Sequence, residues 1–178
     1  VALQSGDAQT TFVSLDLLQL PQVFVQAIHD AVAKKDPSIN VRNIVLTATH
    51  THTAPVLRPG TPGIPVNDET MTVDETITFL AGKISDAIVA AWKNLVPGEM
   101  SYGLDRNSIG FGRRAVYADG SAQMYGNTNR ADFVNLEGMD DDDVGSIFFY
   151  DRQDNLKAIV VNVACPSQVV ESQSSINA

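Results

Sequence analysis

Two histidines, His50 and His52, are the side chains best suited to chemistry, because this 178-residue chain contains only three histidines. They lie in residues 47–55 (TATHTHTAP), directly after the apolar run at residues 44–46. Residues i and i+2 of an extended chain point to the same side, so this spacing predicts that both imidazoles converge where a strand ends. Imidazole is a common ligand of transition metals. The pattern favours a metal or acid–base site; the alternative is two polar histidines on a threonine-rich loop.

Asp16 is a second candidate, because a predicted strand at residues 10–18 (TTFVSLDLL) carries its apolar side chains up to this carboxylate. A helix is predicted over residues 21–35, where apolar side chains recur at helical spacing. Residues 41–49 predict the next strand and complete a β-α-β unit. Such units make consecutive strands parallel, so their carboxyl ends meet at one edge of the sheet, where α/β proteins bind ligands. Asp16 and His50 both lie at this edge; Asp16 is either a functional carboxylate or one that caps a turn or helix.

The remainder of the chain predicts one more helix and then several strands. Thr72 and Glu75 have the spacing of a capping box, which opens a helix predicted over residues 72–96. Trp92 on this helix is expected to pack against the sheet. Residues 58–71 are rich in proline and predict a long loop, of a kind that is usually functional or disordered. The later strands are a hairpin, 114–117 with 122–125, and a pair, 146–150 with 156–164.

These elements predict an α/β fold with a mixed sheet. It contains an N-terminal parallel β-α-β unit, two covering helices and a β-rich C-terminal half. Twelve Lys and Arg against 21 Asp and Glu give a net charge of −9, which argues against a nucleic-acid partner or an anionic membrane surface. No apolar run has membrane-spanning length, and the single cysteine, Cys165, excludes an internal disulfide.

Several common catalytic patterns are absent from the sequence. Neither the G-x-S-x-G nucleophile elbow nor the H-E-x-x-H zinc motif occurs. The four aspartates at residues 140–143 are contiguous, whereas a calcium-binding EF-hand spaces its acidic ligands at alternate positions, so we expect a solvated loop there. From the residues alone, the chain supports a partial metal or acid–base site at a sheet edge.

The same segments resemble the neutral/alkaline (non-lysosomal) ceramidase family. Residues 13–18 (VSLDLL), a helix, and residues 45–55 (VLTATHTHTAP) match a family pattern that contains S-A-THTHS-G-P. Gly112-Arg113-Arg114 resembles an N-R-R element. Residues 137–148 and 157–165 resemble the strand pair that precedes the family's second metal histidine. The resemblance extends over residues 12–170, nearly all of the chain.

The resemblance implies hydrolysis of the amide bond of ceramide, with zinc polarising the carbonyl or activating water. His50 would be a zinc ligand. His52 would be a hydrogen-bonding or acid–base group in the active site, and we expect Asp16 to act with it in catalysis. The residues expected to contact a lipid or other small-molecule substrate are Arg113, Arg114 and Gln168. By the same resemblance, the protein is expected to be secreted or periplasmic.

The chain departs from the family pattern in two ways. Where the family has an A-C-H-P histidine ligand, residues 164–168 read ACPSQ, so the zinc site is incomplete and weak zinc binding is expected. The family's serine nucleophile and later glutamate and tyrosine ligands come after the position of Ala178. We therefore expect residues 1–178 to be a single α/β domain and a fragment of a longer catalytic domain. The alternative function is a non-catalytic domain that keeps this fold and binds a glycan or lipid.

Overall fold

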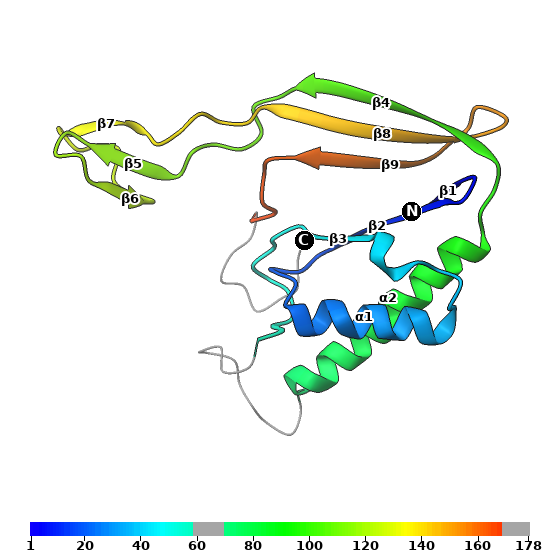
Figure 1. The fold of residues 1–178 in the computed structure, drawn as a ribbon. Helices are drawn as coiled ribbons and strands as arrows, with labels where there is room; N and C mark the ends of the chain where they lie inside the picture. The colour runs from blue at the N-terminus through cyan, green and yellow to red at the C-terminus, as the bar shows by residue number, and fades with distance from the viewer. Residues whose placement is uncertain (59–69, 169–178) are drawn as a thin grey trace. The chain divides into compact units, whose positions relative to one another are not determined.

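The computed structural model describes residues 1–58 and 70–168, and they form two compact units (Figure 1). Unit 1 contains Val1–Pro97 together with the described residues from Pro166 onward, and unit 2 contains Gly98–Cys165. The single domain expected over the whole chain stays a prediction. Most of the proline-rich segment expected to form a loop, residues 59–69, lies outside the described residues.

The sheet of unit 1 has three strands in the order β1-β2-β3. Strand β1 (Ala2–Ser5) pairs antiparallel with β2 (Ala8–Leu15), and β2 pairs parallel with β3 (Ile44–Ala48). The parallel register aligns Thr11 with Ile44 and Leu15 with Ala48. The predicted parallel pair is therefore confirmed. The first residues of the predicted second strand instead form a short 3₁₀ turn, η1 (Val41–Asn43), because the Asn40 side chain accepts a hydrogen bond from the Arg42 amide.

Two helices pack against this sheet. Helix α1 (Gln22–Lys35) starts directly after Pro21, and helix α2 (Val73–Lys93) starts at a complete capping box formed by Thr72 and Glu75. Figure 1 shows both helices on the same side of the sheet, where they share one core with it. Lys35 at the end of α1 joins the two helices, donating hydrogen bonds to Ser85 Oγ and Asp86 Oδ1 of α2.

The core of unit 1 follows the predicted helical spacing. Phe24, Ile28 and Val32 of α1 are fully buried, and burial of such side chains contributes roughly 1.5–3 kcal/mol each. Trp92 Nε1 of α2 donates a hydrogen bond of 2.9 Å to Thr11 Oγ1 of β2, which confirms that this indole packs on the sheet. The core therefore fixes both helices relative to the two parallel strands, and with them the edge at which these strands end.

Unit 2 contains two antiparallel sheets. One has the order β4-β8-β9, formed by β4 (Gly98–Arg106), β8 (Asp143–Asp151) and β9 (Leu156–Val163). The other has the order β6-β5-β7, formed by β5 (Arg114–Tyr117), β6 (Ala122–Met124) and β7 (Phe133–Leu136).

The predicted hairpin and the predicted C-terminal strand pair are both confirmed by these pairings. The predicted fold class, α/β with a mixed sheet, a parallel β-α-β unit, two covering helices and a β-rich C-terminal half, is also confirmed. No helix within the described part of the chain is long and apolar enough to cross a membrane.

Candidate functional site

The candidate site lies where β2 and β3 end. Beyond the last ladder residues the two chains stay hydrogen-bonded: Thr49 N donates to Leu15 O at 3.0 Å, and His50 N donates to Leu17 O at 3.1 Å. The residues that follow β2 therefore determine the backbone position of His50. This edge holds the carboxyl ends of both parallel strands, as the β-α-β pattern predicts.

His50 turns the chain sharply at this edge. Its φ angle of 62° lies in the left-handed region, which costs an ordinary L-residue roughly 1–2 kcal/mol. The two imidazoles nevertheless meet, with ring centroids 5.2 Å apart and planes at 66°. The predicted convergence is found, but a turn at His50 produces it and not an extended i, i+2 arrangement, because β3 already ends at Ala48.

A backbone carbonyl orients the His50 ring. Nδ1 of His50 lies 2.8 Å from the carbonyl oxygen of Leu18. A carbonyl oxygen can only accept, so Nδ1 carries the hydrogen and the Nε2 of a neutral ring keeps its lone pair. Metal-binding histidines in proteins are commonly oriented in this way, through a hydrogen bond from the other ring nitrogen. His50 is also solvent-exposed, so Nε2 has the electronic state and access that a metal or a proton requires.

His52 contacts a residue from the far end of the described chain. The side-chain amide nitrogen of Gln168 lies 2.7 Å from His52 Nε2 and 3.4 Å from Nδ1. The segment that carries Gln168 is fixed at the same strand end, because Ser167 N donates to Thr49 O at 2.8 Å. The structure thus brings together three of the predicted site residues: His50, His52 and Gln168.

The threonines that alternate with the histidines point into the protein. Thr51 and Thr53 are 2% and 7% exposed, whereas His50 and His52 are exposed. The hydroxyl oxygens of the two threonines are 3.2 Å apart, and Thr53 N donates to Thr51 Oγ1 at 3.4 Å. These buried hydroxyls hold the loop that presents the histidines. Sequence reasoning treated the threonines as context only, although their strict alternation with His was a usable signal.

Asp16 lies just after β2 and is solvent-exposed. Within residues 1–58 and 70–168 it forms no hydrogen bond or ion pair with His50 or His52. Its expected catalytic role stays a prediction.

The arginines expected to contact substrate belong to unit 2. Arg114 Nε pairs with the Glu137 carboxylate. Arg113 Nη1 donates to the Tyr125 hydroxyl at 2.9 Å, and its guanidinium carbon lies 5.6 Å from the centre of the Tyr125 ring. Both arginines are exposed and oriented by these partners. Substrate contact through Arg113 and Arg114 stays a prediction.

The described residues do not complete a metal site. Among residues 1–58 and 70–168, no three His, Cys, Asp or Glu side chains lie together in an arrangement that could hold a metal ion. Structural zinc sites use four protein ligands and catalytic sites three. Cys165 belongs to unit 2, where its sulfur lies 4.0 Å from the Ile109 carbonyl oxygen. If Nε2 of His50 were one ligand, a zinc ion would need the others from outside the described residues.

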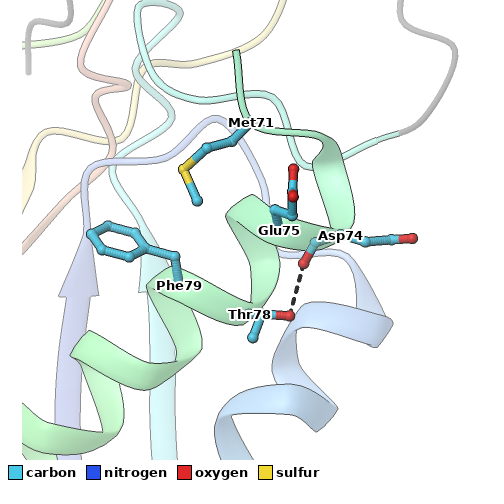
Figure 2. A pocket seen from close by; sticks show the side chains of 5 residues that line it. All are labelled: Met71, Asp74, Glu75, Thr78 and Phe79. Carbon is cyan, nitrogen blue, oxygen red and sulfur yellow. Dashed lines mark hydrogen bonds between the residues drawn. The ribbon is translucent and has the colours of Figure 1, made fainter. Parts of the chain in front are cut away.

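A separate depression of about 400 Å³ lies at the start of α2 (Figure 2), lined by Met71, Asp74, Glu75, Thr78 and Phe79. Of its lining side chains, Glu75 belongs to the capping box of α2. Glu75 accepts hydrogen bonds from the Thr72 amide and hydroxyl, which hold the pKa of the Glu75 carboxyl below its ordinary value. The Thr78 hydroxyl donates to the Asp74 carbonyl. A Glu75 carboxylate kept ionised in this way is a poor proton donor.

No protein-family model matches the sequence, and no curated protein matches it. In structure the chain is similar to neutral ceramidase from Pseudomonas aeruginosa, with a TM-score of 0.66 and 18% sequence identity over 97% of this chain and 26% of that one. It is also similar to a structure of ceramidase complexed with C2, with a TM-score of 0.65 and 19% identity over the same shares. The chain thus spans about a quarter of the length of these proteins. It shares the fold of the matching part of these structures, which confirms the resemblance at the level of fold.

Proposed function

We propose that this chain is part of a hydrolase that cleaves an amide bond in a lipid or another small substrate, with the assistance of zinc. The observation that carries the proposal is the histidine pair at the end of β3 in a chain with the neutral ceramidase fold. The rings of His50 and His52 are in contact, both are exposed, and both lie at the edge of a sheet where α/β proteins bind ligands.

His50 would be the zinc ligand that this chain supplies. Its Nδ1–H is used by the Leu18 carbonyl, so Nε2 is the coordinating atom. A bound zinc ion would polarise the amide carbonyl or activate water. The left-handed backbone at His50 supports this role, because strained conformations of non-glycine residues concentrate at functional sites.

His52 would act beside it as a hydrogen-bonding or acid–base group. The proposal keeps Asp16 as a second polar group at the edge and Arg113 and Arg114 as substrate contacts. It also keeps the expectation of a secreted or periplasmic protein, which rests on the ceramidase resemblance. A net charge of −9 makes nucleic acid an unfavourable partner.

A non-catalytic domain with the same fold, which binds a glycan or lipid at this edge, is the second candidate. One observation favours it: within the described parts of the chain, no group of side chains suffices to hold a metal ion. In that case the exposed histidines would contact the ligand directly, and neither zinc nor turnover would be required.

Hydrolysis of a short-chain fluorogenic ceramide by the full-length protein, measured together with zinc content, separates the two functions. The proposal expects release of the fatty acid, loss of activity with a chelator, and recovery on addition of zinc. Binding of the same lipid without turnover in zinc-containing buffer would reject the hydrolase and support the binding domain. Arg42→Ala is a suitable control variant, because Arg42 is exposed and lies in η1 at the opposite end of β3.

A further inference from the structure

We propose that strand β4 (Gly98–Arg106) is a docking edge, which receives one further strand of the same polypeptide from outside residues 1–178. The inference rests on the part of the proposed function that makes this chain one piece of a longer protein. It does not depend on zinc or on turnover.

Strand β4 lies at an edge of its sheet. The strand order is β4-β8-β9, so among the described residues β4 pairs with β8 alone (Figure 1). The register with β8 runs without a shift from Gly98 with Asp151 to Arg106 with Asp143, which makes the edge regular over nine residues. An edge strand leaves a row of backbone N–H and C=O groups without a partner strand, and such a row is a template for another strand.

One hydrogen bond shows which amides of β4 face this open edge. Asn107 N, directly after the strand, donates to Asp142 O at 2.8 Å. Residues of an antiparallel pair alternate between bonding to the partner strand and pointing away from it. Counting back in twos from Asn107, the odd-numbered amides of β4 therefore face β8. The even-numbered amides, among them those of Met100, Tyr102 and Leu104, face the open edge.

The side chains of Met100, Tyr102 and Leu104 form an exposed apolar row. They lie on one face of the strand because they alternate along it, and they are 63%, 85% and 70% exposed. On that face Tyr102 is aligned with Ile147 of β8, and Ile147 is aligned with Val160 of β9. The apolar face thus continues across the sheet and ends in this row. A further strand with apolar side chains at alternate positions would pack against it.

Strand β4 lacks the features that protect a free edge. Its sequence, GEMSYGLDR, contains neither proline nor lysine, and its charged residues lie near its two ends. The opposite edge strand, β9, differs, because Lys157 stands near its start and its register with β8 shifts between Phe149 and Tyr150. Charged side chains, proline and bulges are the usual protection of an edge. Their absence from the middle of β4 indicates an edge that is paired in the native protein.

The occupant is inferred from the comparison with the ceramidase structures. The matches cover 97% of this chain but only 26% of each of those proteins, so most of their length lies outside the matched part. A strand from such a segment would reach β4 at the high effective concentration of an intramolecular contact. A second copy of this chain is the less favourable occupant, because each copy carries a net charge of −9 and two copies repel each other.

Hydrogen–deuterium exchange of the full-length protein, resolved to single amides by mass spectrometry with fragmentation, tests the docking edge. We expect the outward amides of Met100, Tyr102 and Leu104 to exchange as slowly as the β8-facing amides of Ser101 and Gly103. Fast exchange of the outward amides would overturn the proposal.

The 178-residue chain is the reference for this measurement. Its β8-facing amides should be slow and its outward amides fast. Slow exchange of both sets in this chain would overturn the proposal, because the partner strand would then lie within residues 1–178. If both sets are fast, the sheet needs the rest of the protein to fold, and the comparison within the full-length protein decides alone.

Tyr102→Pro removes an outward N–H and keeps the bonds that β4 donates to β8. Proline is tolerated in an edge strand where the missing N–H would face away from the sheet. In the full-length protein, exchange at Met100 and Leu104 should become at least about tenfold faster, because their hydrogen bonds to the docked strand are lost. Tyr102→Val is the matched control, which keeps the N–H and a strand-forming side chain and should leave both amides slow. Unchanged exchange at Met100 and Leu104 in Tyr102→Pro would overturn the proposal.

The dependence on protein concentration separates the two occupants. Protection that persists in a monomer, as measured by light scattering, supports a strand of the same polypeptide. Protection that disappears when a dimer is diluted would assign the edge to a second copy and overturn the proposal. Absence of ceramide hydrolysis by the full-length protein would reject the proposed function, whereas the exchange pattern would still decide whether β4 receives a strand.

Discussion

His50 Nδ1 lies 2.8 Å from the carbonyl oxygen of Leu18, a residue 32 positions earlier in the chain. The contact follows from the parallel pairing of β2 with β3, which continues past both strands through the hydrogen bonds to Leu15 and Leu17. A single secondary-structure relationship therefore determines the position, the tautomer and the open nitrogen of this histidine.

The left-handed backbone of His50 should make glycine better tolerated there than alanine. Both substitutions remove the imidazole and its bond to Leu18, but only glycine accepts a φ of 62° without steric cost. We expect His50→Gly to be more stable than His50→Ala by about 1 kcal/mol in urea denaturation. Thr49 is the matched control: its φ is not positive, so glycine should be less stable than alanine there. If the glycine and alanine variants ranked in the same order of stability at both positions, the left-handed backbone of His50 would not be the cause.

His50 should matter more than His52 for zinc-linked activity of the full-length protein. Loss of a ligand removes the Lewis acid and the template for the substrate, so His50→Ala should abolish turnover and reduce bound zinc. His52→Ala should keep the zinc and lower the rate by about 10²–10⁴-fold, as expected for a lost hydrogen-bonding or proton-transfer partner. Zinc content and rate are measured on each variant. Equal loss of zinc in both variants would indicate that both histidines are ligands. Full zinc content and full activity in His50→Ala would show that the zinc site does not include this residue.

Zinc should bind weakly to the 178-residue chain. The Leu18 carbonyl orients the His50 ring with Nε2 open for coordination, but residues 1–58 and 70–168 provide no group of three suitable side chains. We expect zinc to be lost on dialysis against metal-free buffer, as measured by atomic emission. Stoichiometric zinc after dialysis would contradict this expectation and indicate ligands beyond the described residues or from a second chain.

The hydrogen bond from Trp92 to Thr11 should contribute to the stability of unit 1. Thr11 is 2% exposed, so Trp92→Phe leaves its hydroxyl buried without this donor, at a cost of about 1–3 kcal/mol. In the double variant with Thr11→Val the polar group is also gone, and the destabilisation should be smaller than the sum of the two single changes. Thermal or urea unfolding of the four proteins measures this coupling. Strict additivity would show that the hydrogen bond is not the stabilising element.

Acid should remove the contribution of the capping carboxylate of α2. Hydrogen bonds from the Thr72 amide and hydroxyl lower the pKa of Glu75 from its ordinary value of 4.5. A lowered folded-state pKa means that the stabilisation is complete above about pH 4.5 and is lost as the pH falls through the folded value. The stability difference between the unmodified protein and Glu75→Gln should therefore shrink as the pH is lowered through this window. Urea unfolding at pH 6 and at pH 3 compares them, and a difference that does not change with pH would argue against this cap.

Local sequence signals predicted most of the fold for a physical reason. Helix periodicity, the Thr72–Glu75 capping box and the β-branched runs before Asp16 and His50 act over a few residues, and steric preferences at that range are readable from the chain. They predicted α1, α2 and the parallel pair of β2 and β3. Strand β1 was missed because Ala2–Ser5 is a short and mainly polar segment, and its strand conformation comes from pairing with β2.

The candidate site was predicted in its residues but not in its geometry. The sequence by itself determined that two histidines stand at the end of a strand, that Asp16 lies near the same edge, and that Gln168 stands close to a strand end. Only the tertiary structure decided that His50 adopts a left-handed turn, that Leu18 orients its ring, and that Gln168 contacts His52 across 116 residues of sequence. These relations depend on the packing of α1 and α2 against the sheet and on the return of residues 166–168 to Thr49. No local propensity encodes such contacts, because they form between segments that only the folded core brings together.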